Sequence, residues 1–149
     1  MRSSKISTVG FNGINIYDVT IEVQILPGIP SFNIVGLGDK AINESKHRIS
    51  GALYSIGATP PGGKIIVNLS PANVEKYGTH YDLGICLCIL SIIKKVNIPN
   101  NCIVMGEVTL DGLILPVNGM LLGAEYAMKN NKILIGPMEN WQEIAIVGN

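Results

Sequence analysis

A histidine and a carboxylate, His80 and Asp82, stand close together in the sequence. An imidazole beside a carboxylate is half of a general acid–base or nucleophilic site. No nucleophile is evident, because Cys86 and Cys88 fall in an apolar segment that we expect to be buried, and Thr79 has no identifiable base. We therefore interpret the pair as structural, with His80 or Asp82 satisfying loop amides at a helix N-terminus. A hydrolase that uses His80 and Asp82 with an unrecognised nucleophile is the alternative.

Two glycine-rich segments come close to nucleotide-binding motifs. Residues 57–65 nearly form a P-loop, but Lys64 stands one position late and Ile65 offers no hydroxyl to a bound Mg²⁺. Residues 36–41 fit G-x-G-x-x-A, yet Asp39 would repel a pyrophosphate and no acidic residue ends the next expected strand. We expect ordinary turns at both places, and a chain that binds neither ATP nor another cofactor by itself.

The composition excludes several classes of protein. Eleven Lys and Arg residues balance eleven Asp and Glu residues, and hydrophobic residues make up 47% of the chain. Disorder and strong electrostatic binding of DNA are therefore excluded, although weak binding through Lys94 and Lys95 is a further alternative. The longest apolar run, residues 83–93, is about half of what a bilayer requires. No export signal is visible, so we expect a cytoplasmic protein without a membrane partner.

The three cysteines, Cys86, Cys88 and Cys102, suit neither a disulfide framework nor a zinc site. The first two are two residues apart on an expected helix, and the third has no companion nearby. We expect free thiols in a reducing compartment, and no metal site.

Strand-like alternation and helical spacing divide the first half of the chain. Residues 7–26 alternate as a β-hairpin with its turn at Asn12-Gly13, and residues 31–35 predict a strand. Asp39 is placed to cap a helix that Gly57 ends. Its expected buried face carries Ile42, Ser45, Ile49, Ala52, Leu53 and Ile56, and its solvated face carries Lys40, Glu44, His47 and Arg48.

The second half predicts further strands and helices. Strands are expected over residues 64–69, 103–110, 113–117 and 132–135, with a hairpin turn at Asp111-Gly112, and helices over 81–95, 121–129 and 140–147. This order indicates an α+β or mixed α/β fold, with helices layered on a mixed sheet in a single domain of residues 1–149.

Four segments together resemble the N-terminal domain of the magnesium-chelatase-like AAA+ ATPases of the ComM/YifB family. They are residues 36–48, 66–72, 81–83 and 106–112, the last followed by Pro116-Val117. The resemblance runs from about residue 5 to the end, in order and with compatible spacing. It implies a Lon protease-like fold of the ribosomal protein S5 domain 2-like type.

Lon proteases carry a serine nucleophile in a run reading K-D-G-P-S-A-G and a lysine base in one reading L-P-I-G-G-L-K. These runs fall on residues 76–82 and 115–121, with His80 at the serine position and Leu121 at the lysine position. A histidine cannot carry the acyl group here and a leucine accepts no proton. The resemblance therefore implies a pseudoenzyme without catalytic, cofactor-binding or metal-binding residues.

In the family, as the resemblance implies, an AAA+ ATPase module follows this domain, binds ATP and Mg²⁺ through a P-loop and assembles into a ring. ComM-type members are branch-migration motors of natural transformation. Residues 1–149 lack that module, so we expect a truncated chain, from a split gene or a dedicated adaptor. Its expected role is interaction or regulation. An AAA+ module encoded separately is the expected partner, self-association is left open, and DNA is reached only through the motor.

Overall fold

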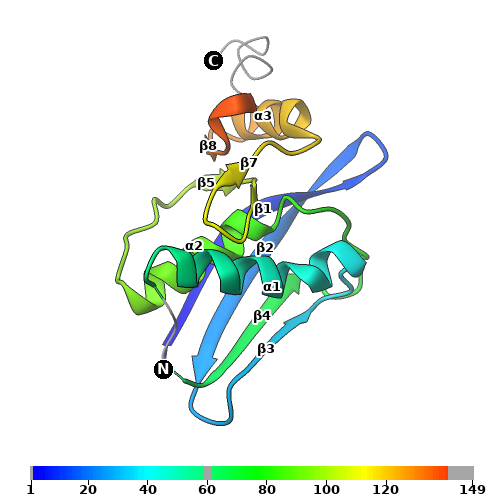
Figure 1. Ribbon diagram of the computed structural model, residues 1–149. Coiled ribbons are helices and arrows are strands. Elements are labelled where there is room, and N and C mark those ends of the chain that lie inside the picture. Colours follow the sequence, from blue (N-terminus) through cyan, green and yellow to red (C-terminus); the bar gives the residue numbers. More distant parts are fainter. Residues whose placement is uncertain (1, 59–61, 141–149) are drawn as a thin grey trace.

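A mixed β-sheet with helices packed on it forms the frame of the protein, as the sequence predicts for a mixed α/β fold (Figure 1). The computed structural model describes residues 2–58 and 62–140. In that part of the chain the elements are β1 Arg2–Asn12, β2 Asn15–Leu26, β3 Ser31–Val35, α1 Lys40–Ser55, β4 Lys64–Ser70, α2 Asp82–Ile93, β5 Cys102–Val104, β6 Glu107–Val108, β7 Ile114–Leu115, α3 Met120–Lys129, β8 Ile133–Ile135 and the 3₁₀ helix η1 Met138–Asn140. Most of the helix expected over residues 140–147 lies outside the described residues.

The six-stranded sheet has the order β3-β4-β2-β1-β5-β8. The neighbours β1, β2 and β4 pair antiparallel, whereas β3 pairs with β4, and β5 with both β1 and β8, in parallel. The short strands β6 and β7 form a separate antiparallel hairpin. The sheet is therefore mixed, with a long antiparallel centre and parallel strands toward both edges.

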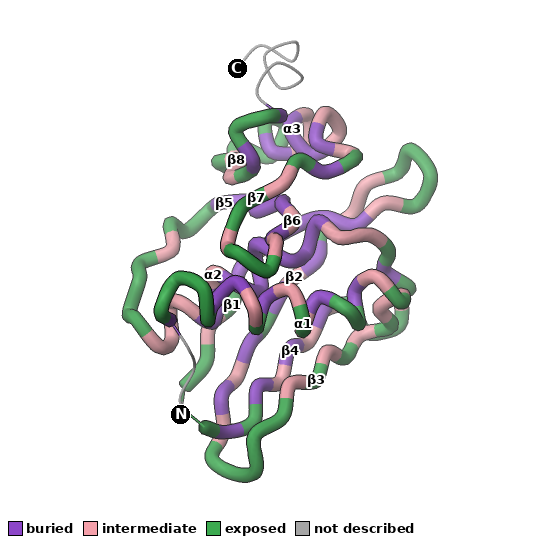
Figure 2. Tube along the Cα trace, in the orientation of Figure 1, coloured by how far each residue is buried: buried purple, intermediate pink, exposed green. Residues whose placement is uncertain are grey.

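Hydrophobic clusters lie on both faces of the sheet. Figure 2 shows buried residues alternating with more exposed ones along β2 and β4. Ile6 belongs to the cluster beneath α1 and α2, and Val9, three residues further along β1, belongs to the cluster beneath α3. Successive side chains of a strand point to opposite faces, so these two residues mark the two sides. Cys102 and Ile103 of β5 divide between the clusters in the same way. The helices α1 and α2 thus cover one face, and α3 covers part of the other.

The hairpin of β1 and β2 forms as the alternation predicts, but its turn is one residue later than expected. Asn12 pairs with Asn15, which leaves Gly13 and Ile14 as the loop. Gly13 has a φ of 65°, and Asn12 lies in the strand. A glycine takes a positive φ without steric cost and asparagine takes it at some cost, so the turn is centred on the glycine.

Helix α1 confirms the expected cap and most of the expected buried face. The Asp39 side chain accepts a hydrogen bond from the Ile42 N–H at 2.9 Å, and Gly57, with a φ of 74°, follows the last turn. Ile56 is an exception, because it lies past the last helical residue and is 55% exposed. The prediction for Arg48 was also wrong, since this side chain folds over α1 onto α2 rather than into solvent.

The single strand predicted over residues 103–110 is wrong, because the chain leaves the sheet in its middle. Gly106 donates its N–H to the His80 carbonyl at 3.1 Å and accepts from the Leu83 N–H at 3.0 Å. Its backbone thus binds the start of α2 instead of a neighbouring strand. The strand therefore divides into β5 in the main sheet and β6 in the small hairpin.

The turn of the β6–β7 hairpin is longer than the two-residue turn predicted at Asp111-Gly112. Val108 pairs with Ile114, so residues 109–113 form the loop. The Thr109 hydroxyl holds the loop together, because it donates to the Asp111 carboxylate and accepts from the Leu113 N–H. Only one of the two expected turn residues, Gly112, has a positive φ, whereas a type I′ turn needs two.

None of the helices in residues 2–58 and 62–140 combines the length and the apolar content that crossing a membrane requires.

Candidate functional site

Asp82 is the centre of a buried polar cluster that joins α1, α2 and β6. Its Oδ1 accepts hydrogen bonds from Ser45 Oγ at 2.5 Å and from Arg48 Nη2 at 3.0 Å. Its Oδ2 accepts from Arg48 Nε at 2.7 Å and from the Val108 N–H at 3.2 Å. An ionised carboxylate has about four acceptor sites, and four donors are present here. Asp82 is therefore fully engaged within the protein.

The charges of this cluster support an ion pair between Arg48 and Asp82. Burial raises the pKa of Asp82, and the hydrogen bonds from Arg48, Ser45 and the Val108 N–H act against that rise. The hydrogen bond to Asp82 is the largest cause that raises the pKa of Arg48, so the guanidinium is charged. The Asp82 side chain is 0% exposed, which keeps it out of contact with a dissolved substrate. The cluster is a junction between elements.

His80 lies in the hydrophobic interior rather than in a cleft. It is 4% exposed, and its Nε2 is 2.7 Å from the Val9 carbonyl oxygen. That contact makes Nε2 the protonated nitrogen of a neutral ring. The ring packs against Phe11, with 5.3 Å between centroids, and against Tyr81, with 4.1 Å. Burial lowers the pKa of His80 to about 4.

This lowered pKa predicts a pH-dependent stability. Because the folded protein disfavours a charged His80, the stabilisation is complete above the ordinary pKa of 6.5 and is lost as the pH falls toward 4. We expect the free energy of unfolding to fall by about 3 kcal/mol between pH 7 and pH 4 on account of this residue. Urea unfolding at a series of pH values measures it.

The control for this experiment is the other histidine, His47, which is exposed on α1. His80→Gln should flatten the pH profile, and His47→Gln should leave it as it is. Equal slopes in the two variants would show that His80 is not the group responsible.

The structure does not join His80 to Asp82. Among the described residues no hydrogen bond connects the two, because His80 binds β1 while Asp82 binds α1 and β6. Thr79 is half-buried, and no contact of its hydroxyl with His80 is present in the same part of the chain. The acid–base pair of the hydrolase alternative is therefore not assembled in the described residues. The predicted capping role is wrong, because no side chain caps the start of α2: His80 binds the Val9 carbonyl, and Asp82 binds α1 and the Val108 N–H of β6.

The two runs that align with the Lon motifs approach each other around Phe11. A Cβ atom on Gly119 would lie 2.7 Å from the Phe11 ring, and the same ring packs edge-on against His80. Leu121 stands in the first turn of α3, immediately after this contact, and is half-buried. Of the two positions that align with the Lon dyad, one therefore holds a half-buried leucine. The other holds a buried histidine whose Nε2 is hydrogen-bonded to a backbone carbonyl.

The G-x-G-x-x-A segment forms the turn between β3 and α1 and binds a second loop. Asp39 N–H donates to the Lys76 carbonyl at 3.0 Å, and the Asp39 carboxylate accepts from the Gly78 N–H at 3.3 Å. Lys76 is completely buried, and its ammonium donates to the carbonyl oxygens of Gly36, at 2.7 Å, and Pro71. Burial lowers the pKa of Lys76. Lys76 thus ties the G-x-G-x-x-A turn to the loop that precedes α2.

Sequence reasoning missed two polar features. One is the buried Lys76, and the other is the ion pair between Arg48 and the buried Asp82. Residues 70–79, which lie between an expected strand and an expected helix, gave no sign that Lys76 would turn inward. The available signal for the Asp82 cluster was Ser45, which was expected on the buried face of α1. Arg48 follows three residues later, and residues three apart are neighbours on a helix surface.

The Tyr81 hydroxyl is buried and has no hydrogen-bond partner among the described residues. Leaving a buried hydroxyl unpaired costs about 1–3 kcal/mol. We therefore expect Tyr81→Phe to raise the free energy of unfolding by about 1 kcal/mol, measured by chemical denaturation. In the matched variant Tyr17→Phe the change should be unfavourable, because the Tyr17 hydroxyl donates to the Glu75 carbonyl at 3.2 Å.

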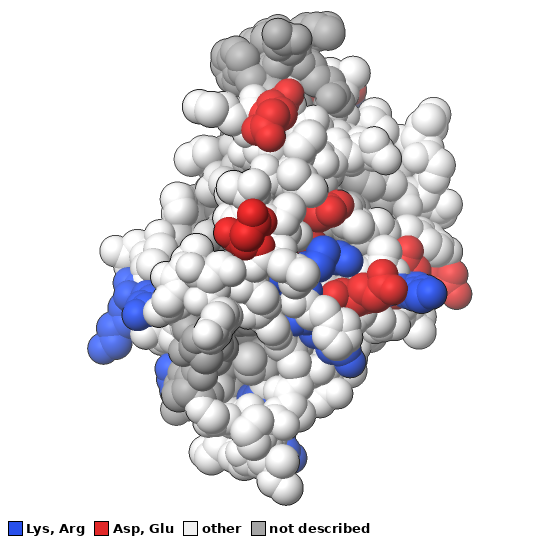
Figure 3. All heavy atoms as spheres, viewed as in Figure 1, with Lys and Arg blue, Asp and Glu red and all other residues white. Residues whose placement is uncertain are grey.

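The remaining candidate groups do not form a site in the described residues. Cys86, Cys88 and Cys102 are free and buried, and burial raises the pKa of the first two to about 11 and about 12. No group of His, Cys, Asp and Glu side chains in residues 2–58 and 62–140 is arranged to hold a metal ion. Lys94 and Lys95 are exposed after α2. On the face shown in Figure 3, basic and acidic side chains are interspersed.

Comparisons with known proteins give the same family as the sequence segments. The family model described as subunit ChlI of Mg-chelatase matches residues 21–140. The uncharacterized protein YifB of Escherichia coli strain K12 is 30% identical over 99% of this chain and 29% of its own length. Competence protein ComM of Haemophilus influenzae is 31% identical over 92% of this chain and 27% of its own. Lon protease 2 of Bacillus subtilis is 25% identical over 93% of this chain and 28% of its own.

The chain spans less than a third of the length of each of these relatives. The match to a Lon protease along almost the whole chain agrees with the Lon-like fold that the family resemblance implies. Because the family model covers most of the chain, the protein belongs to the family of Mg-chelatase subunit ChlI.

Proposed function

We propose that this chain is a non-catalytic interaction or regulatory domain for a Mg-chelatase-like AAA+ ATPase of the ComM/YifB type. It works in the cytoplasm, binds no ATP or metal through residues 1–149, and contacts the ATPase module of such a motor. Through that motor it serves the processing of DNA in natural transformation. Its similarity to a competence protein supports this role.

One observation carries the proposal. The position of the Lon nucleophile holds His80, which is buried and hydrogen-bonded to Val9, and the position of the base holds Leu121. A protein of this family without the dyad keeps the surface of the domain but not its peptidase chemistry. A pseudoenzyme acts through its contacts with other protein. The part of its relatives that this chain does not match is the first candidate for such a contact.

An exchange of domains tests this role. The segment of E. coli YifB that matches this chain is replaced by residues 1–149, and ATP hydrolysis is measured with and without branched DNA. We expect the exchanged protein to hydrolyse ATP as wild-type YifB does, and YifB without the segment to lose its response to DNA. The same low activity in the exchanged and deleted proteins would argue against the proposal.

Two measurements on the chain alone address the alternatives. A fluorescent ATP analogue should not bind, and casein should not be cleaved. Cleavage that disappears in His80→Ala would instead favour a hydrolase. Retardation of DNA at low salt that is lost in the double variant Lys94→Ala, Lys95→Ala would favour direct DNA binding.

A further inference from the structure

Strand β1 is paired along its whole length on one side and hardly at all on the other. Every residue from Arg2 to Asn12 has a partner in β2. On the opposite side, the described residues supply one pair, Ser7 with Ile103 of β5. Along residues 2–6, β1 therefore has an edge that no described strand pairs, and the N–H and C=O groups of the alternate residues that point outward there require hydrogen-bond partners.

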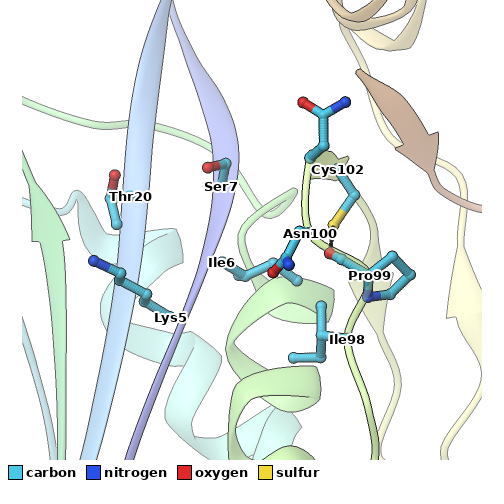
Figure 4. Close-up of a pocket in the computed structure, with 9 residues that line it drawn as sticks. Lys5, Ile6, Ser7, Thr20, Ile98, Pro99, Asn100 and Cys102 are labelled. Carbon is cyan, nitrogen blue, oxygen red and sulfur yellow. Dashed lines mark hydrogen bonds between the residues drawn. The ribbon is translucent and has the colours of Figure 1, made fainter. Parts of the chain in front are cut away.

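A groove of about 340 Å³ lies at this edge. One wall is β1 at Lys5, Ile6 and Ser7, and the other is the segment of residues 98–102 that leads into β5. Figure 4 shows the two walls diverging below β5, with a helix behind the gap. The groove thus occupies the position that a strand beside β1 would take.

The two sides of the groove differ in chemistry. Ile6 belongs to the core beneath α1 and α2, and Ile98 packs against the same core. Lys5 and Ser7 point to the other face of the sheet, because they alternate with Ile6 along the strand. Thr20, the partner of Ser7 in β2, lines the groove on that face. An entering strand would meet apolar atoms on its inner side and an ammonium with hydroxyls on its outer side.

Asn100 projects its side chain into the gap between the walls (Figure 4). An amide side chain offers donors and an acceptor, as a peptide backbone does. The Asn100 amide lies across the groove from β1. A strand added beside β1 would present its second edge to this amide. Glu22, which lies across from Lys5 in β2, has its carboxylate bound by Asn68 Nδ2 at 3.2 Å.

We propose that this groove binds an extended acidic peptide, which adds to the sheet as a strand beside residues 2–6 of β1. The unpaired main-chain edge selects an extended backbone. Because one side of the groove is apolar and the other polar, it selects a peptide in which apolar and polar residues alternate. Apolar residues of the peptide face Ile6 and Ile98, and acidic residues face Lys5. Any polypeptide can supply such a segment, so the groove does not depend on an ATPase partner.

Fluorescein-labelled eight-residue peptides test the proposal by fluorescence polarisation. One peptide alternates valine with glutamate, and a second alternates valine with lysine. We expect the chain to bind the first and not the second, with a preference of about tenfold or more at low salt. Methylation of the backbone nitrogens along one edge of the first peptide should abolish binding, because it removes the donors of the added ladder.

A charge reversal in the groove separates this site from general attraction of charge. Lys5→Glu should weaken binding of the glutamate peptide about tenfold and improve binding of the lysine peptide. Lys64→Glu makes the same change of charge on β4, away from the groove, and should leave both affinities unchanged. Addition of the glutamate peptide should also slow hydrogen exchange at the amides of residues 2–7.

Three results would overturn the proposal. They are failure of both peptides to bind at millimolar concentration, equal effects of Lys5→Glu and Lys64→Glu, and binding that survives backbone methylation. A stable dimer in sedimentation that Lys5→Glu dissociates would instead assign the edge to a second copy of the chain. None of these results depends on ATP hydrolysis by a YifB exchange protein.

Discussion

Replacement of Asp82 by alanine is expected to lower the free energy of unfolding by about 3–5 kcal/mol. The carboxylate accepts hydrogen bonds from Ser45, from the Val108 N–H and from two nitrogens of Arg48. Its loss leaves Arg48 Nε and the Val108 N–H without an acceptor, although Arg48 Nη2 keeps the Ala41 carbonyl and the Ser45 hydroxyl. It also leaves a cation, with only 20% of its side chain exposed, without its counter-charge. Urea denaturation at pH 7, followed by circular dichroism, measures the change.

Two controls show whether the loss of stability comes from the buried ion pair or from the packing around it. Glu44→Ala removes an exposed carboxylate of α1 and should change the stability by less than about 0.5 kcal/mol. The double variant Arg48→Met, Asp82→Leu should recover most of the loss, because replacing both members of a buried pair by apolar residues is often nearly neutral. A double variant as unstable as Asp82→Ala would show that the ion pair is not the source of the effect.

Gly36→Ala is expected to destabilise the protein by about 3–4 kcal/mol. Gly36 has a φ of 117°, a region that L residues rarely adopt, and a Cβ there would lie 2.3 Å from the Leu69 carbonyl oxygen. Both the backbone angle and the contact with β4 are unfavourable, and β4 cannot move without breaking its pairing with β2. Thermal and urea unfolding measure the loss.

Gly13→Ala is the matched control, because Gly13 also has a positive φ but no atom within 4 Å of the added Cβ. We expect a loss of about 1 kcal/mol there, from the backbone alone. Similar losses at the two positions would mean that the close approach of β3 to β4 contributes nothing. A larger loss at Gly36 than at Gly13 would instead show that the close approach to β4 requires the first glycine of the G-x-G segment.

The elements that follow from local rules were predicted well. The β1–β2 hairpin depends on alternation and a turn glycine, and α1 depends on a cap at Asp39 and on apolar residues at helical spacing. Such signals lie within a few residues of the structure that they specify. The helix α2 follows equally directly from its continuous apolar run.

The polar contacts between elements could not be predicted in this way. Arg48 and Asp82 are 34 residues apart, and their pairing depends on how α1 lies over α2. Lys76 turns inward because two loops, each unremarkable in sequence, lie side by side and offer it carbonyl oxygens. In the same way the strand over residues 103–110 divides because the start of α2 takes the hydrogen bonds of Gly106. Each depends on the assembled fold.

The position of β1 in the sheet has a consequence for how the protein is made. Ser7 pairs with Ile103, and the Thr8 hydroxyl donates to the Val104 carbonyl at 2.6 Å across 96 residues of sequence. On the ribosome, β1 emerges long before β5 and must therefore wait for β5 before its second neighbour exists. Contacts of such long range slow folding and leave apolar edges exposed meanwhile. Nascent chains of this protein are thus expected to rely on chaperones until β5 and β8 have left the exit tunnel.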